Sequence, residues 1–192
     1  PNKFEKHGIE PHPKAATIAK TRNIKIISDS IEGLNLSQKY QCITLLDTVE
    51  HFVNPTDTLD RLIVGIEQGG VIVICSGATD TLQWRIMAPY YWYCCLPEHV
   101  SFLNRKYLEK YCAKNSLYLA LYKKISSEES VFPMNLVQWL KALLYCSDFV
   151  FRNSKTWDLL RKIPRINKIR QWSSPPWLTM SKNHFIAVIQ KK

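Results

Sequence analysis

Short apolar runs alternate with amphipathic stretches along the first half of the chain. Residues 24–27, 42–46 and 71–75 are apolar and rich in β-branched side chains, as is typical of strands buried on both faces. Residues 13–21 and 55–67 have helical spacing, and each stretch begins with a proline suited to a first helical turn. Strands that alternate with helices predict an α/β fold with a doubly wound, mostly parallel sheet of the Rossmann-like type.

Further signals extend this pattern in both directions. A strand over 6–9 is expected before the first helix, and Gly69-Gly70 is expected to end the second helix as a left-handed C-cap. Downstream we expect a helix over 105–115, a strand over 117–123 and a last strand over 184–190. The segment between the last two strands, at about 125–182, is interpreted as a helical insertion, with helical pieces at 135–146 and 156–163.

An aromatic and aperiodic stretch follows the third apolar run. It contains Trp84 and the run Tyr90, Tyr91, Trp92 and Tyr93, and it predicts a long loop on the active side of the sheet. Two interpretations stay open at this point. The rings wall a pocket for a substrate, or they cap the exposed end of the sheet.

Composition adds limits to this picture. The 192 residues, 46% of them hydrophobic, suffice for one globular domain spanning 1–192. Six cysteines without CxxC spacing favour a reducing, cytoplasmic environment. Lys141 and Asp148 interrupt the longest apolar segment, so no membrane span is expected.

Positive charge is concentrated near the carboxyl terminus. The net charge is +10, and residues 151–192 contain ten basic side chains but only one acidic residue, Asp158. Together with the apolar stripe of the insertion, these cations predict peripheral contact of residues 134–172 with an anionic membrane. A solvated basic face and contact with phosphate or nucleic acid are the alternatives.

Acidic residues follow three of the predicted strands. Glu10, Asp29 and Asp47 each stand where an apolar run ends. Ligands of doubly wound sheets bind at the carboxyl ends of the strands, where a carboxylate can accept both hydrogen bonds of a ribose diol. The alternative for each residue is a turn former or an N-cap.

These stretches resemble the class I S-adenosylmethionine-dependent methyltransferases, particularly the branch of the ubiquinone-biosynthesis O-methyltransferases. The resemblance is carried by "GIEPHPKAATIAK", "ISDSIEGL", "YQCITLLDTVEHFVNPTDTLDRL", "GGVIVICSGA" and "PEHVSFLNRKYLEKYCAKNSL". It covers most of residues 7–124, and residues 183–190 match the last, antiparallel strand of the family. It implies an S-adenosylmethionine cofactor and methylation of an oxygen on a small-molecule or lipid-linked acceptor.

The resemblance also implies roles for individual residues. Glu10 would hold the ribose hydroxyls, Asp29 and Ser30 would border the adenine, and Leu46 with Asp47 would line the methionine end of the cofactor. The predicted catalytic residues are His51, His99 and Asp47. An imidazole titrates near neutral pH, so either histidine could accept a proton from an attacking hydroxyl, although both could instead only hold loops.

Two further features limit these expectations. Asp47, Glu50 and His51 have a ligand-like spacing, and some relatives are thought to use a divalent ion. We assign no metal ligands, because side chains on a strand-to-helix turn often face different ways.

The glycine-rich first loop of the family is missing from this sequence, so we expect an N-terminally incomplete domain. A non-catalytic binding module is the alternative that this absence favours. A nucleic-acid methyltransferase is the other alternative, and it is disfavoured because the Asn/Asp-Pro-Pro-Tyr/Phe type of signature is missing.

Overall fold

The structure, a computed structural model, describes residues 4–34, 38–87, 90–126, 132–151 and 182–192, together with 159, 162–164 and 168. The strands are β1 (His7–Ile9), β2 (Lys25–Ser28), β3 (Tyr40–Leu46), β4 (Ile66–Gly77), β5 (Leu117–Ile125) and β6 (His184–Lys191). The α-helices are α1 (Pro13–Thr21), α2 (Pro55–Val64), α3 (Leu82–Met87), α4 (Arg105–Lys114) and α5 (Phe132–Val150), and the 3₁₀ helices are η1 (Val49–His51) and η3 (Trp92–Cys95).

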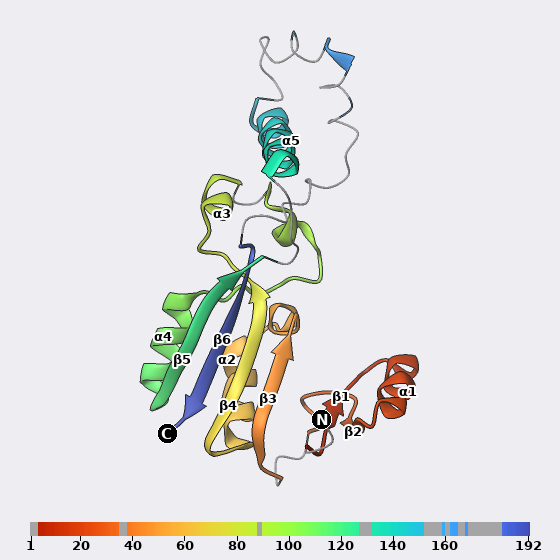
Figure 1. Cartoon of the computed structure of the whole chain (residues 1–192), viewed down its shortest axis with the longest axis vertical. Coiled ribbons are helices and arrows are strands. Elements are labelled where there is room, and N and C mark those ends of the chain that lie inside the picture. Colours follow the sequence, from red (N-terminus) through yellow and green to blue (C-terminus); the bar gives the residue numbers. More distant parts are fainter. Residues whose placement is uncertain are drawn as a thin grey trace.

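The main sheet has four strands in the order β3-β4-β6-β5 (Figure 1). β3 runs parallel to β4, whereas β6 runs antiparallel to both of its neighbours, β4 and β5. The predicted α/β fold with an antiparallel last strand is therefore confirmed. The carboxyl ends of β3, β4 and β5 point toward α5 (Figure 1).

The first two strands form a separate parallel sheet with α1 beside it (Figure 1). In the part of the chain that the structure describes, no strand joins β1 to β3. The two sheets are connected by a side-chain hydrogen bond of 3.1 Å between His7 Nδ1 and the Tyr40 hydroxyl. The doubly wound sheet is thus divided into two parts.

Helices α2 and α4 pack on the main sheet and form its core. Leu59 and Leu62 of α2 are buried, and so are Leu108 and Tyr111 of α4. Each helix begins at an asparagine whose side chain accepts a hydrogen bond from a backbone N–H of the first turn. This core holds the carboxyl ends of β3 and β4 in place.

One predicted boundary is wrong. Helix α2 ends at Val64 with Gly65 as its C-cap, and the chain enters β4 at once. Gly69 does have a positive φ of 76°, but it lies inside β4, where the register with β3 is irregular. The left-handed glycine therefore marks a bulge and not the end of a helix.

The predicted long loop contains helices α3 and η3, and its rings are mostly buried. Tyr91, Trp92 and Tyr93 pack with Met87 and with Ala142 of α5 in a second hydrophobic cluster. The rings of this cluster join α5 to the end of the sheet, and so they are core side chains.

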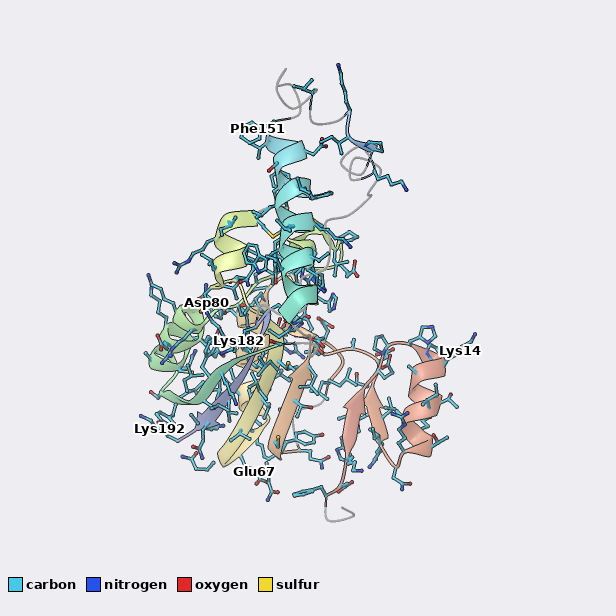
Figure 2. All side chains as sticks on the ribbon, turned by 45° about the horizontal axis from the view of Figure 1, so that its top comes forward. Lys14, Glu67, Asp80, Phe151, Lys182 and Lys192 are labelled. Carbon is cyan, nitrogen blue, oxygen red and sulfur yellow. The ribbon has the colours of Figure 1, made fainter. Side chains whose placement is uncertain are left out.

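Helix α5 is longer than the predicted 135–146 and extends beyond the ends of the strands. Phe151 lies at the far end of this extension, and Glu67 and Lys192 lie at the opposite end of the molecule (Figure 2). Among the described residues, no helix has the length and apolar character needed to cross a membrane. Most of the predicted helical piece at 156–163 lies outside the described residues.

Candidate functional site

A cavity of about 620 Å³ lies between β1 and β3, within the range of small-molecule sites. Ile9 and Pro11 line it on the side of β1, Ser30 follows β2, and Thr48 and His51 follow β3. The cavity therefore extends to the carboxyl ends of the parallel strands, where ligands of this fold class bind.

Glu10 and Ser30, two of the predicted nucleoside-binding residues, make local hydrogen bonds. Glu10 directly follows β1, and its Oε1 accepts a hydrogen bond of 2.9 Å from the backbone N–H of His12 at the start of α1. Asp29 is exposed after β2, and the Ser30 hydroxyl accepts a hydrogen bond from the backbone N–H of Gly33. Glu10 thus makes the turn contact that was its alternative role, and Ser30 lines the cavity.

The predicted residues at the end of β3 are exposed. Leu46 is 58% exposed, and the side chain of Asp47 is 66% exposed. Asp47 adopts a left-handed conformation with φ 45°, and its backbone N–H donates a hydrogen bond to the carbonyl of Cys75. This conformation ends β3 and starts the short helix η1, and an aspartate tolerates it better than most residues.

Helix η1 directs two adjacent side chains to opposite environments. Glu50 is only 1% exposed, whereas His51 is exposed and lines the cavity. The backbone carbonyl of Glu50 accepts hydrogen bonds from the N–H groups of Val100 and Ser101, which tie η1 to the loop that contains His99. A single turn of helix therefore connects the buried core to the wall of the cavity.

The buried carboxylate of Glu50 is held by two hydroxyl groups. The Tyr93 hydroxyl donates to Oε1 at 2.5 Å, and the Ser76 hydroxyl donates to Oε2 at 2.9 Å. Burial and the neighbouring carboxylate raise the pKa of Tyr93, so its hydroxyl stays protonated as a donor. Gly77 allows the tyrosine ring to lie against β4, because a Cβ there would come within 2.2 Å of the ring.

His51 and His99 lie side by side, with ring centroids 5.0 Å apart. His51 Nδ1 is 3.0 Å from the carbonyl oxygen of Glu98, and His99 Nδ1 is 2.8 Å from that of Tyr93. A carbonyl only accepts hydrogen bonds, so each Nδ1 carries a proton. In the neutral form, each Nε2 then has a free lone pair.

A third histidine completes this group. His184 begins β6 opposite Gly77, is buried, and has its Nε2 3.7 Å from a carboxylate oxygen of Asp47. Burial lowers the pKa of its imidazole, and the nearby carboxylates of Asp47 and Glu50 do not fully offset this effect. A neutral imidazole is therefore favoured at this position.

Sequence reasoning did not find Ser76, Tyr93 or His184 as members of this group. Their positions in the chain are far apart, and only the pairing of β4 with β6 and the packing of η3 bring them together. Glu50 carried a visible signal, because it stands directly before His51 just after an apolar run ends. Its burial could not be inferred from that signal.

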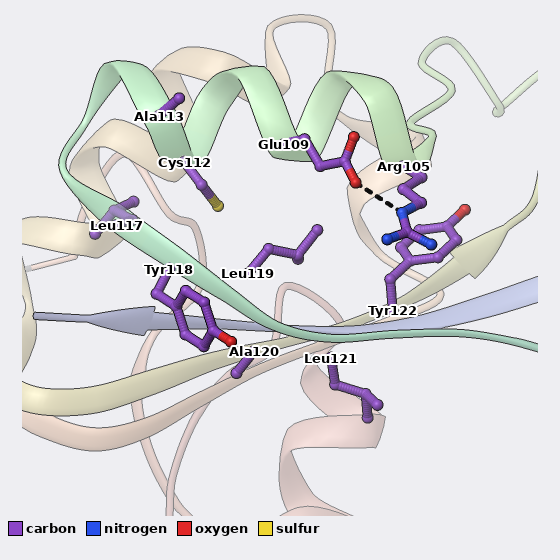
Figure 3. A pocket seen from close by; sticks show the side chains of 10 residues that line it. All are labelled: Arg105, Glu109, Cys112, Ala113, Leu117, Tyr118, Leu119, Ala120, Leu121 and Tyr122. Carbon is purple, nitrogen blue, oxygen red and sulfur yellow. Dashed lines mark hydrogen bonds and ion pairs between the residues drawn. The ribbon is translucent and has the colours of Figure 1, made fainter.

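A second hollow, of about 410 Å³, lies between α4 and β5 (Figure 3). Arg105 and Glu109 pair across its rim, and the thiol of Cys112 points toward β5 (Figure 3). The hollow is open and faces the edge strand. Burial raises the pKa of Cys112, so this thiol is not an activated nucleophile.

A family model described as a methyltransferase domain matches residues 1–120 of this chain. The match covers more than half of the 192 residues, so the chain belongs to the methyltransferase-domain family. No curated protein matches the chain.

Solved structures share the fold at low sequence identity. A methyltransferase from Thermotoga maritima, described as S-adenosylmethionine-dependent and as a possible histamine N-methyltransferase, has a TM-score of 0.55 and 12% identity, over 96% of this chain and 72% of its own. The [4+2]-cyclase SpnF has a TM-score of 0.54 and 11% identity, over 96% of this chain and 65% of its own.

The plantazolicin methyltransferase BpumL, solved in complex with SAH, has a TM-score of 0.50 and 17% identity, over 97% of this chain and 66% of its own. The chain thus spans about two thirds of the length of SpnF and BpumL. The likeness confirms the fold alone, because proteins of one fold can carry out different reactions.

Proposed function

We propose that the chain binds S-adenosylmethionine in the cavity between β1 and β3 and acts as a methyltransferase. The family match supports this proposal, and so does the likeness to BpumL, whose structure contains SAH. The observation that carries it is the position of the cavity, because Ser30 and His51 line it beyond the carboxyl ends of β2 and β3. Glu10 lies between Ile9 and Pro11, which both line the cavity, although Glu10 itself is not a lining residue. In this proposal Glu10 holds the ribose, Asp29 and Ser30 border the adenine, and Leu46 and Asp47 lie toward the methionine end.

The reaction would be methylation of an acceptor oxygen, as in the ubiquinone-biosynthesis branch. The sulfonium is an activated methyl donor, so the protein needs to align the acceptor, the methyl group and the sulfur, and to accept one proton. His51 lines the cavity, and the ring of His99 lies beside that of His51. In the neutral form, either imidazole can accept the proton with the lone pair of its Nε2 atom. Asp47 sits at the same strand end and favours a positive charge nearby.

Titration with SAH tests the cofactor site. We expect saturable binding by calorimetry, with an affinity at least about 10-fold weaker in Glu10→Gln, because an amide has only one acceptor oxygen for two ribose hydroxyls. Glu67→Gln is the matched control, since Glu67 is exposed near the start of β4, away from the carboxyl ends of the strands (Figure 2). Absence of binding would overturn the proposal, as would equal losses in the two variants. Binding without methyl transfer to any acceptor would favour the non-catalytic binding module.

We propose further that the acceptor is lipid-linked and that α5 contacts an anionic membrane. Leu136, Leu140 and Leu143 are exposed on this helix. Ala142, a member of the second hydrophobic cluster, and Tyr145 are buried. An outward apolar stripe suits insertion at the level of lipid headgroups, and Lys162 and Lys168 follow it in the chain.

Sedimentation with phosphatidylserine vesicles tests the membrane contact. The unmodified chain should bind the vesicles, and binding should fall in Leu140→Glu. Absence of binding by both the unmodified chain and the variant would contradict the proposal. Cytoplasmic localisation stays a prediction.

A further inference from the structure

Strand β5 forms a free edge of the main sheet. It pairs with β6 on one side, and within the described part of the chain no strand lies on its other side (Figure 1). An edge strand presents a row of backbone N–H and C=O groups with which another extended chain can pair. β5 is nine residues long, and its positions 117–122 carry no charged side chain. This edge therefore has the length and the character to accept a further strand.

The hollow between α4 and β5 follows this edge. Its volume of about 410 Å³ lies within the range of ligand pockets, and Ala113 and Leu119 are among the residues that line it (Figure 3). Leu119 points toward α4, whereas Tyr118 and Leu121 lie on the opposite face of the strand and are exposed (Figure 3). A strand added at this edge would thus direct alternate side chains into the hollow and against Tyr118 and Leu121.

Unpaired positive charge surrounds the hollow. The carboxylates of Glu109 and Asp80 do not neutralise it, because they pair with Arg105 and Lys124. Each lysine of α4 near the hollow directly follows a residue that lines it. Charge complementarity at this edge therefore requires an acidic partner. The exposed lysines that have no acidic partner among the described residues are Lys106, Lys110 and Lys114 of α4 and Lys123 of β5.

We propose that β5 binds an extended, acidic segment of a partner protein, which adds to the main sheet as a further strand. Backbone hydrogen bonds along the edge supply affinity, the hollow receives an apolar side chain of the segment, and the lysines pair with its carboxylates. A second copy of this chain fits less well, because each copy has a net charge of +10 and brings the same lysines to the edge. A nucleic acid would match the charge but would leave the strand edge unpaired and the apolar hollow unfilled.

Fluorescence anisotropy with a labelled peptide of alternating Glu and Val, equal in length to β5, tests the edge. We expect saturable binding to the full chain at low salt. The same peptide with every backbone N–H methylated should not bind, because it keeps the charges but loses the donors. Lys110→Glu/Lys114→Glu should weaken binding about 10-fold, since two attractive charges become repulsive. Lys14→Glu/Lys20→Glu is the matched control, because it makes the same charge change on α1, on the other side of the molecule (Figure 1), and it should bind as the unmodified chain does.

A second variant locates the segment at the hollow. Ala113 is exposed on α4, so Ala113→Phe should fold, which circular dichroism checks, and its ring should occupy the hollow and weaken binding. No binding of the peptide, equal binding of its methylated form, or equal losses in the two lysine pairs would overturn the proposal. Tighter binding of a single-stranded DNA oligonucleotide than of the peptide would also overturn it, as would dimerisation of the unmodified chain that Ala113→Phe abolishes. None of these readouts involves SAH, so a negative result would leave the SAH titration untouched.

Discussion

The two walls of the cavity differ in how they are supported. The β1–β2 wall, residues 4–34, contains no buried residue, and its polar side chains mostly bond to neighbours a few positions away. On the other side, Thr48 and His51 line the cavity. They belong to a group that we call the β3–β4 wall, defined as Asp47–His51 with Ser76, Tyr93, His99 and His184, which packs against the two hydrophobic clusters. Its hydrogen bonds join residues that are far apart in the chain, as between Tyr93 and Glu50.

This difference separates two ways of building a site. Local turns can place Glu10 and Ser30 without a core, but such segments open at little free-energy cost. Long-range contacts hold the β3–β4 wall rigidly in place. A change to one of these contacts should therefore lower the free energy of unfolding of the whole domain. We expect the β1–β2 wall to be ordered by its ligand and the β3–β4 wall to be ordered before the ligand arrives.

Substitution of Gly77 should break the β3–β4 wall and have the largest effect. In Gly77→Ala, the new Cβ would come within 2.2 Å of the Tyr93 ring, which must move away from β4 and from Glu50. We expect the free energy of unfolding in urea to fall by roughly 2–4 kcal/mol, since overpacking and a lost buried hydrogen bond combine. Gly33→Ala is the matched change in the β1–β2 wall, where a Cβ would meet two serine hydroxyls at 3.2 and 3.3 Å and a carboxylate oxygen of Asp29 at 4.0 Å. A loss as large as that of Gly77→Ala in this control would contradict the difference between the walls.

Removal of one hydroxyl sharpens the same comparison. Tyr93→Phe keeps the ring but takes one of the two hydroxyl donors from the buried carboxylate of Glu50. We expect a loss of about 1–3 kcal/mol in the free energy of unfolding, because a buried acceptor is left without its partner. Tyr118→Phe is a control in the same sheet, since Tyr118 is exposed on β5. Equal stability of Tyr93→Phe and the unmodified chain would show that Glu50 does not depend on this bond.

Most of the fold could be predicted because its signals are local. The proline-started helices and the β-branched strands follow from residues within one element, and α1 has the predicted bounds. The end of α2 could not be predicted in this way. The same glycine pair suits a C-cap and a bulge, and only the pairing of β4 with β3 decides between them.

The site was less predictable than the fold for the same reason. His51 and His99 could be singled out as chemically able residues, but their proximity depends on hydrogen bonds between η1 and a loop about fifty residues later. The aromatic run illustrates the limit further. Tyr91 and Tyr93 look alike in sequence, yet only Tyr93 bonds to Glu50, because Gly77 leaves room for its ring.

The smallest effect should come from protonation of His184 in the β3–β4 wall. Burial lowers the pKa of this imidazole in the folded chain, below the value of about 6.5 that an unfolded chain would have. Between these two values the unfolded chain binds more protons, so the free energy of unfolding should fall as the pH drops below about 6.5 and should be insensitive to His184 above it. Urea unfolding between about pH 5 and pH 8 measures this slope, and it should be shallower in His184→Gln. Equal slopes in the unmodified chain and in His184→Gln would mean that His184 is not held neutral by its surroundings. The β3–β4 wall would then be more accessible to water than the burial of His184 indicates.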